Sequence, residues 1–110
     1  MALPSLNGCR GPVEYPGSLS HPGLITNIRD SQQIETIGTA YLKKALKEDK
    51  RTLVRLLLAE APDDTTAIPG FLEKQVARDF ETGDTVMVNG WILSKTEARQ
   101  CALYSLEQNN

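Results

Sequence analysis

The sequence predicts a small, mainly α-helical domain: a bundle of about four helices with one short β-hairpin, from Thr85 to Leu93, before the last helix. Three observations predict this fold. Apolar residues recur every three or four positions in three separate stretches, as on one face of a helix. The dipeptide Asn89-Gly90 lies between two short apolar runs, which is the strongest local signal for a hairpin. A Ser-x-x-Glu pattern, which caps helices, follows at once.

The first helix is expected to begin near Asp30, which can cap it with Gln33 as the partner in a capping box. Its apolar stripe consists of Ile34, Ile37, Gly38, Tyr41, Leu42 and Ala45. A glycine inside a helix costs about 1 kcal/mol relative to alanine. Gly38 therefore marks a place where another element can approach closely. The lysines that follow suit the negative end of the helix and are expected to be solvated.

The second and third helices are expected at residues 50–61 and 69–82. Leucines form the deepest stripe of the second, and Pro62 ends it. In the third, Leu72, Val76 and Phe80 recur every four residues. Gly83 follows as a C-terminal cap that can adopt a left-handed conformation.

A two-residue turn in the hairpin sets Met87 opposite Ile92 on one face. The other face carries Val86, Val88, Trp91 and Leu93. Because both faces are apolar, we expect the hairpin to be covered on two sides or to meet a partner on one. Trp91 is either the largest core residue or part of a contact surface, and these two alternatives stay open.

The last helix is expected to start with a capping box formed by Ser94 and Glu97. One of its sides carries only small residues, so that side can approach another element closely. These residues are Ala98, Cys101, Ala102 and Ser105.

The composition limits the possible functions. The chain has 110 residues, enough for one small domain, which we place at residues 26–108 after a flexible segment or spacer at residues 1–25. A net charge of −2 gives no electrostatic basis for binding nucleic acid. The single histidine, His21, lies in a Ser/Pro/Gly segment, and the two cysteines are far apart. We therefore predict no metal site, no cofactor and no catalytic triad.

Near the N-terminus, Leu6-Asn7-Gly8-Cys9 resembles a bacterial lipobox, in which the cysteine is lipidated after cleavage. Lipidation of Cys9 would be the protein's link to a membrane, and the Pro/Gly/Ser-rich stretch to about Gly23, expected to be extended or disordered, would be a spacer. The full-length gene would then encode a basic start and an apolar run upstream. The alternative is a chance match in a glycine-rich loop.

Cys9 could also pair with Cys101 in an exported protein, although Cys101 also fits a buried small hydrophobe on a helix.

One pattern extends beyond local structure. Asp79-Phe80, Gly83 and the run from Gly90 to Leu103 fit an acidic-aromatic pair, a glycine turn and the motif GWxLSxTEARxCAL. With the stretch that begins at Ile34, they resemble a family of small bacterial proteins exported with twin-arginine or lipoprotein signals. The resemblance implies a periplasmic or membrane-anchored location. By analogy with similar small exported proteins, it also implies an accessory role beside a periplasmic oxidoreductase.

Three functions follow as hypotheses. The first is a non-catalytic exported binding or accessory subunit, with a contact surface made by Trp91, Met87 and Ile92 and a polar rim that includes Thr96, Glu97 and Arg99. The second is a small enzyme that uses carboxylates for acid–base chemistry. Its candidate residues are Asp79, Glu81, Asp84, Glu97 and Arg99. The third is a cytoplasmic helical adaptor, in which the lipobox match is accidental.

Overall fold

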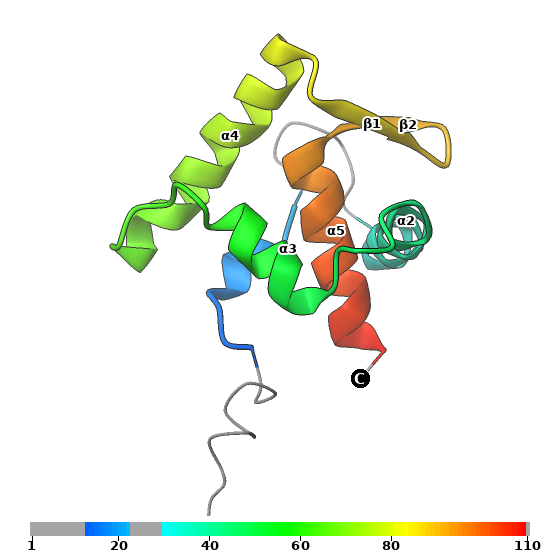
Figure 1. Cartoon of the computed structure of the whole chain (residues 1–110), viewed down its shortest axis with the longest axis horizontal. Helices are drawn as coiled ribbons and strands as arrows, with labels where there is room; N and C mark the ends of the chain where they lie inside the picture. Colours follow the sequence, from blue (N-terminus) through cyan, green and yellow to red (C-terminus); the bar gives the residue numbers. More distant parts are fainter. Residues whose placement is uncertain (1–12, 23–29, 110) are drawn as a thin grey trace, which may run out of the picture.

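The computed structural model describes residues 13–22 and 30–109. Within this part, four α-helices and one two-stranded antiparallel hairpin confirm the predicted mainly α fold (Figure 1). The elements are η1 (Gly17–Ser20), α2 (Ser31–Lys44), α3 (Lys50–Leu57), η2 (Thr65–Ala67), α4 (Ile68–Thr82), β1 (Thr85–Val88), β2 (Trp91–Ser94) and α5 (Lys95–Gln108).

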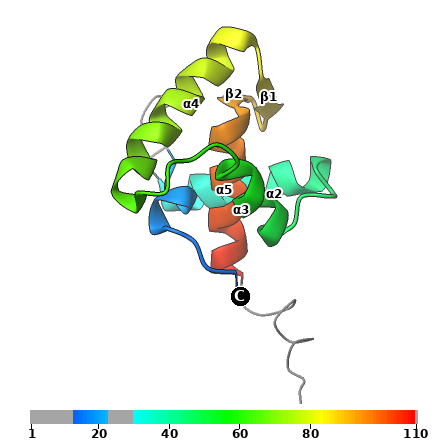
Figure 2. The same ribbon diagram turned by 60° about the vertical axis from the view of Figure 1, so that its left-hand side comes forward.

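Helix α5 is the centre of the molecule. Helices α2, α3 and α4, the short turn η1 and both strands all pack against it (Figures 1 and 2). Ala98, Cys101, Ala102 and Leu103 are fully buried on this helix. Because burial extends around more of α5 than one stripe, its sequence shows weaker amphipathic patterning than a surface helix would.

The close approach of α2 to α5 joins two predictions made separately from the sequence. A Cβ atom built on Gly38 would lie 2.0 Å from the carbonyl oxygen of Cys101, so only glycine fits at this position. One turn away, the hydroxyls of Thr39 and Ser105 are 2.7 Å apart and share a hydrogen bond. The small side of α5 therefore receives the backbone of α2 directly.

The helix ends follow mostly from local sequence. Asp30 caps α2 as expected, but its side chain accepts from the backbone N–H of Gln32, and Gln33 is exposed. Helix α3 ends at Leu57, four residues earlier than predicted. Beyond it, the N–H groups of Ala59 and Ala61 donate to carbonyls three residues back, so the chain tightens into turns before Pro62. Gly83 ends α4 with a φ of 76°, as predicted.

The segment before α2 differs from the expectation of an extended or disordered chain. Its described part, residues 13–22, contains the turn η1, whose Leu19 is completely buried among residues of α3, α4 and α5. The carbonyl of Ser18 accepts a hydrogen bond from Gln100 Nε2 at 3.1 Å, and the Tyr15 hydroxyl donates to Glu107. A single leucine creates no periodicity, yet burying it is worth about 1.5–3 kcal/mol. Cys9 lies outside the described residues.

The hairpin has the predicted register, with Val88 opposite Trp91 and Met87 opposite Ile92. Asn89 and Gly90 both have positive φ, 50° and 83°, as a two-residue turn of this kind requires. On the inner face Val88 and Leu93 are fully buried, while Val86 and Trp91 pack against the same core.

Candidate functional site: the hairpin and its junction with the last helix

The backbone N–H groups at the junction between β2 and α5 have hydrogen-bond acceptors within the protein. The predicted capping box is present: Glu97 N–H donates to Ser94 Oγ at 2.9 Å, and Ser94 N–H donates to Glu97 Oε1 at 3.2 Å. Lys95 N–H donates to the carbonyl of Asp84 at 3.1 Å. Thr96 N–H donates to Asp79 Oδ2 at 2.9 Å. The first three N–H groups of α5 therefore have partners inside the protein, which leaves no free donors there for an anionic ligand.

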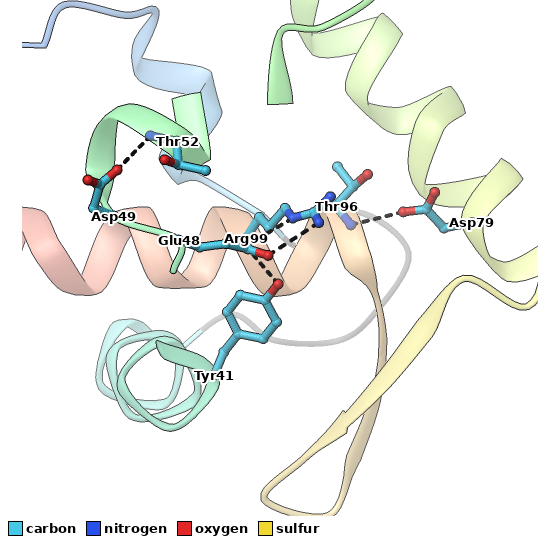
Figure 3. A network of polar contacts seen from close by, with 7 residues as sticks. All are labelled: Tyr41, Glu48, Asp49, Thr52, Asp79, Thr96 and Arg99. Atoms are coloured by element: carbon cyan, nitrogen blue, oxygen red, sulfur yellow. Dashed lines mark hydrogen bonds and ion pairs between the residues drawn. The ribbon is translucent and has the colours of Figure 1, made fainter. Parts of the chain in front are cut away.

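Asp79 acts as a cap supplied from another helix. Its side chain extends from α4 to the start of α5, and the residue is only 3% exposed (Figure 3). The second carboxylate oxygen accepts from Gln75 Nε2 at 3.1 Å. A negative charge at the positive end of a helix is stabilised by the helix dipole. This geometry gives the carboxylate a structural role and joins α4 to α5.

A second polar cluster joins α2 to α5 through the loop between α2 and α3. Glu48 Oε1 accepts from the Tyr41 hydroxyl at 2.8 Å and from Arg99 Nε at 3.1 Å (Figure 3). Arg99 Nη2 donates to the other oxygen at 3.4 Å, so the ion pair is forked. Burial, followed by the hydrogen bond to Glu48, raises the pKa of Tyr41 to about 12. Sequence reasoning missed Glu48, because a lone acid in a charged loop carries no local signal.

A cleft of about 260 Å³ lies between α3, α4 and the start of α5. Asp79, Asp84 and Arg99 line it, so three of the residues considered for acid–base chemistry are close together. The other two lie elsewhere: Glu81 is exposed and outside the lining, and Glu97 is buried in the capping box. Among the described residues no group of three His, Cys, Asp or Glu side chains could hold a metal ion.

The opposite side of the hairpin is apolar and open. Met87 is 58% exposed and Ile92 is 59% exposed, and they face each other across the two strands. We call these two residues the outer hairpin face. Lys44, in the last turn of α2, donates from Nζ to the carbonyl of Met87 at 2.6 Å. The sequence indicated the apolar pair, whereas this contact depends on how α2 packs.

The five residues predicted to bind a partner lie in different environments. Only Met87 and Ile92 are together on the outer hairpin face. Trp91 is partly buried on the inner face against the core. Thr96 is 5% exposed, and Arg99 is paired with Glu48, so neither forms a rim around the apolar pair.

Cys101 has no disulfide partner among the described residues and is fully buried where α5 meets α2. Burial, with a smaller contribution from the charge of Glu97, raises its pKa to about 12. The prediction that it serves as a small hydrophobe agrees with this environment. Because Cys9 lies outside the described residues, lipidation of Cys9 and its pairing with Cys101 both stay predictions.

The sequence and the structure were compared with known protein families, curated proteins and solved structures. No family model matches the chain, and neither a curated protein nor a solved structure is similar to it. None of the helices in residues 13–22 and 30–109 is long and apolar enough to cross a membrane.

Proposed function

We propose that this protein is a non-catalytic accessory or binding subunit that contacts a protein partner through its outer hairpin face. The observation that carries this proposal is the exposure of Met87 and Ile92, each more than half accessible on a hairpin whose other face is packed into the core. Adjacent large apolar side chains that are exposed on an element anchored in the core are the kind of surface that a partner covers.

The structural use of the nearby charged groups supports a binding role over a catalytic one. Asp79 and Glu97 satisfy backbone N–H groups at the start of α5, and Arg99 is held by Glu48. Residues that match the motif GWxLSxTEARxCAL have packing or capping roles in this junction. The motif residues therefore serve to hold the hairpin in place against α5.

The location and the identity of the partner belong to the same proposal. The match of Leu6-Asn7-Gly8-Cys9 to a lipobox supports a periplasmic, lipid-anchored protein, and the family resemblance supports an exported oxidoreductase as partner. Incorporation of labelled palmitate by the full-length product, lost on Cys9→Ala, tests the anchor. A product found only in the cytoplasm without lipid would support the adaptor hypothesis instead.

The contact itself can be tested by photo-crosslinking in the native host. A photoreactive amino acid at position 87 or 92 is expected to give one discrete crosslinked protein. Leu46 is the matched control, because it is apolar and 85% exposed but outside the outer hairpin face. Crosslinks that are equally frequent from position 46, or absent from positions 87 and 92, would overturn the proposal.

A second candidate is favoured by the cleft that places Asp84 beside Asp79 and Arg99. A small enzyme that used these carboxylates would lose activity on Asp84→Asn. The variant is suited to this test because Asp84 is exposed and the hydrogen bond to Lys95 uses its backbone. Unchanged thermal unfolding together with a lost hydrolytic or isomerase activity would establish this alternative.

A further inference from the structure

The hydrogen-bond pattern of the hairpin determines which backbone groups face outward. Bonded and non-bonded pairs alternate along an antiparallel ladder. Lys95 N–H donates to the Asp84 carbonyl, one pair beyond the end of the recorded register. The pair formed by Met87 and Ile92 lies three pairs from that bond, so it is a non-bonded pair. The N–H and C=O groups of both residues therefore point away from the partner strand, toward the two edges of the hairpin.

The β1 edge is already occupied. Helix α2 packs beside β1, and Lys44 Nζ binds the Met87 carbonyl at 2.6 Å. This contact agrees with the outward direction derived from the ladder. Because Lys44 takes the outward carbonyl of Met87, an added strand on this edge would have to displace it.

The β2 edge differs at Ile92. No described residue makes a hydrogen bond to the Ile92 N–H or carbonyl, and the side chain is 59% exposed. The open edge is short, because the Ser94 N–H is taken by Glu97. One residue therefore offers a donor, an acceptor and an apolar side chain together.

We propose that β2 accepts a short extended segment of a partner protein as a third strand, paired with the backbone of Ile92. This inference rests on the proposed function and names the chemistry of the partner. A hydrocarbon surface could cover Met87 and Ile92, but it would leave the Ile92 N–H and carbonyl without partners, whereas a strand satisfies both.

The size of the exposed apolar surface and the charges around the hairpin indicate what kind of segment would bind. Two side chains that are a little over half exposed offer much less than the ~800 Å² that each partner buries in a standard interface, so a linear segment fits better than a second folded copy. The charges flanking the hairpin on its α2 side are positive. Lys44 touches Met87, and Lys43 lines a groove with Asn89 at the turn. The complementary segment is apolar on the side facing Met87 and Ile92. Both lysines lie on the β1 side of the hairpin, so they favour acidic over basic flanks in a segment at β2 only through longer-range attraction.

Synthetic peptides test this inference on the full chain. The probe is acetyl-Asp-Val-Thr-Val-Asp-amide, followed by amide chemical shifts and hydrogen exchange. Binding is expected to shift the amide signals of Trp91, Ile92 and Leu93 and to slow exchange at Ile92. A peptide N-methylated at both valines and at the threonine lacks the N–H facing β2 in either strand direction, and it is expected to bind at least tenfold more weakly. The version with Lys in place of Asp should also bind more weakly than the acidic one.

Two variants test the same bond from the protein side. Among hydrogen-bonding groups, Ile92→Pro removes only the outward N–H, although it also fixes φ and replaces the side chain. It should reduce affinity for the acidic peptide about tenfold, whereas Ile92→Thr keeps this donor and should retain most of the binding. If Ile92→Pro does not fold, the N-methylated peptide still tests the bond. Equal binding of both peptides, shifts confined to the groove near Lys43, or no shift at millimolar peptide would overturn the inference. So would Trp91 fluorescence changes with phosphatidylglycerol vesicles in the absence of any peptide effect.

Failure of this inference is distinguishable from failure of the proposed function. Crosslinks from positions 87 and 92 to a partner, with no peptide effect at β2, would leave the binding role in place and remove strand addition. Absence of both would remove both.

Discussion

The contact between α2 and α5 and the outer hairpin face use apolar surface in opposite ways. Where α2 meets α5, glycine and small side chains bring two backbones together, and Gly38 leaves no room even for a methyl group. On the outer hairpin face, Met87 and Ile92 are large and more than half exposed. The first region has a sequence that the fold requires, whereas the second carries apolar side chains that the fold of the described residues does not use.

The same contrast exists within the hairpin itself. Leu93 is fully buried while its neighbour Ile92 points outward, because successive side chains of a strand face opposite sides. The hairpin therefore packs into the apolar core through one face only. Its other face is therefore the place to look for a role outside folding.

The largest effect is expected from Gly38→Ala. The added methyl group would collide with the backbone at Cys101, so α2 must move away from α5 or strain the contact, with a loss of about 3 kcal/mol in the free energy of unfolding. Gly70→Ala is the matched control. A Cβ atom there meets nothing within 4 Å, and the change should stabilise helix α4 by up to about 1 kcal/mol. Urea unfolding of the two variants measures the difference, and equal stabilities would contradict the close approach.

A smaller loss is expected from Asp79→Ala. This change leaves the buried Thr96 N–H without its acceptor and should lower the free energy of unfolding by about 2 kcal/mol. Glu81→Ala, two residues away and exposed, should change it by less than ~0.5 kcal/mol. Denaturant unfolding at neutral pH measures both, and a similar effect of the two changes would argue against capping from α4.

A pH-dependent effect is expected at Tyr41. Because folding raises the pKa of this hydroxyl from 10.0 to about 12, the neutral form stabilises the folded state at pH values below 10. That contribution should be lost as the pH rises from 10 toward 12. Tyr41→Phe should therefore show a shallower alkaline loss of stability than the parent protein in urea titrations at several pH values. An identical alkaline slope would show that the hydroxyl does not titrate differently in the folded state.

Structural features formed by residues close together in the sequence could be predicted, whereas contacts between distant residues could not. The turn at Asn89-Gly90, the register of the hairpin and the capping box of Ser94 and Glu97 follow from neighbours in the chain, and all three are confirmed. The cap from Asp79 to Thr96 and the ion pair between Glu48 and Arg99 join residues far apart in the sequence. No local pattern indicates such pairs.

The N-terminal segment illustrates the same limit. Its composition predicts a loop, but Leu19 finds a complete apolar environment made by three helices. For the candidate site, the alternating pattern correctly placed Met87 and Ile92 on one face. It could not show that Arg99 would be paired inside the protein, because the partner Glu48 precedes it by about fifty positions.

The most direct test of the account is the free energy of unfolding of the double variant Met87→Ser/Ile92→Ser, measured beside Leu93→Ala. If the outer hairpin face serves binding and the inner face serves folding, the double variant should remain within ~0.5 kcal/mol of the parent protein. Leu93→Ala should lose about 3 kcal/mol through the cavity it creates. A loss of 2 kcal/mol or more in the double variant would contradict the account, because it would mean that Met87 and Ile92 are part of the core.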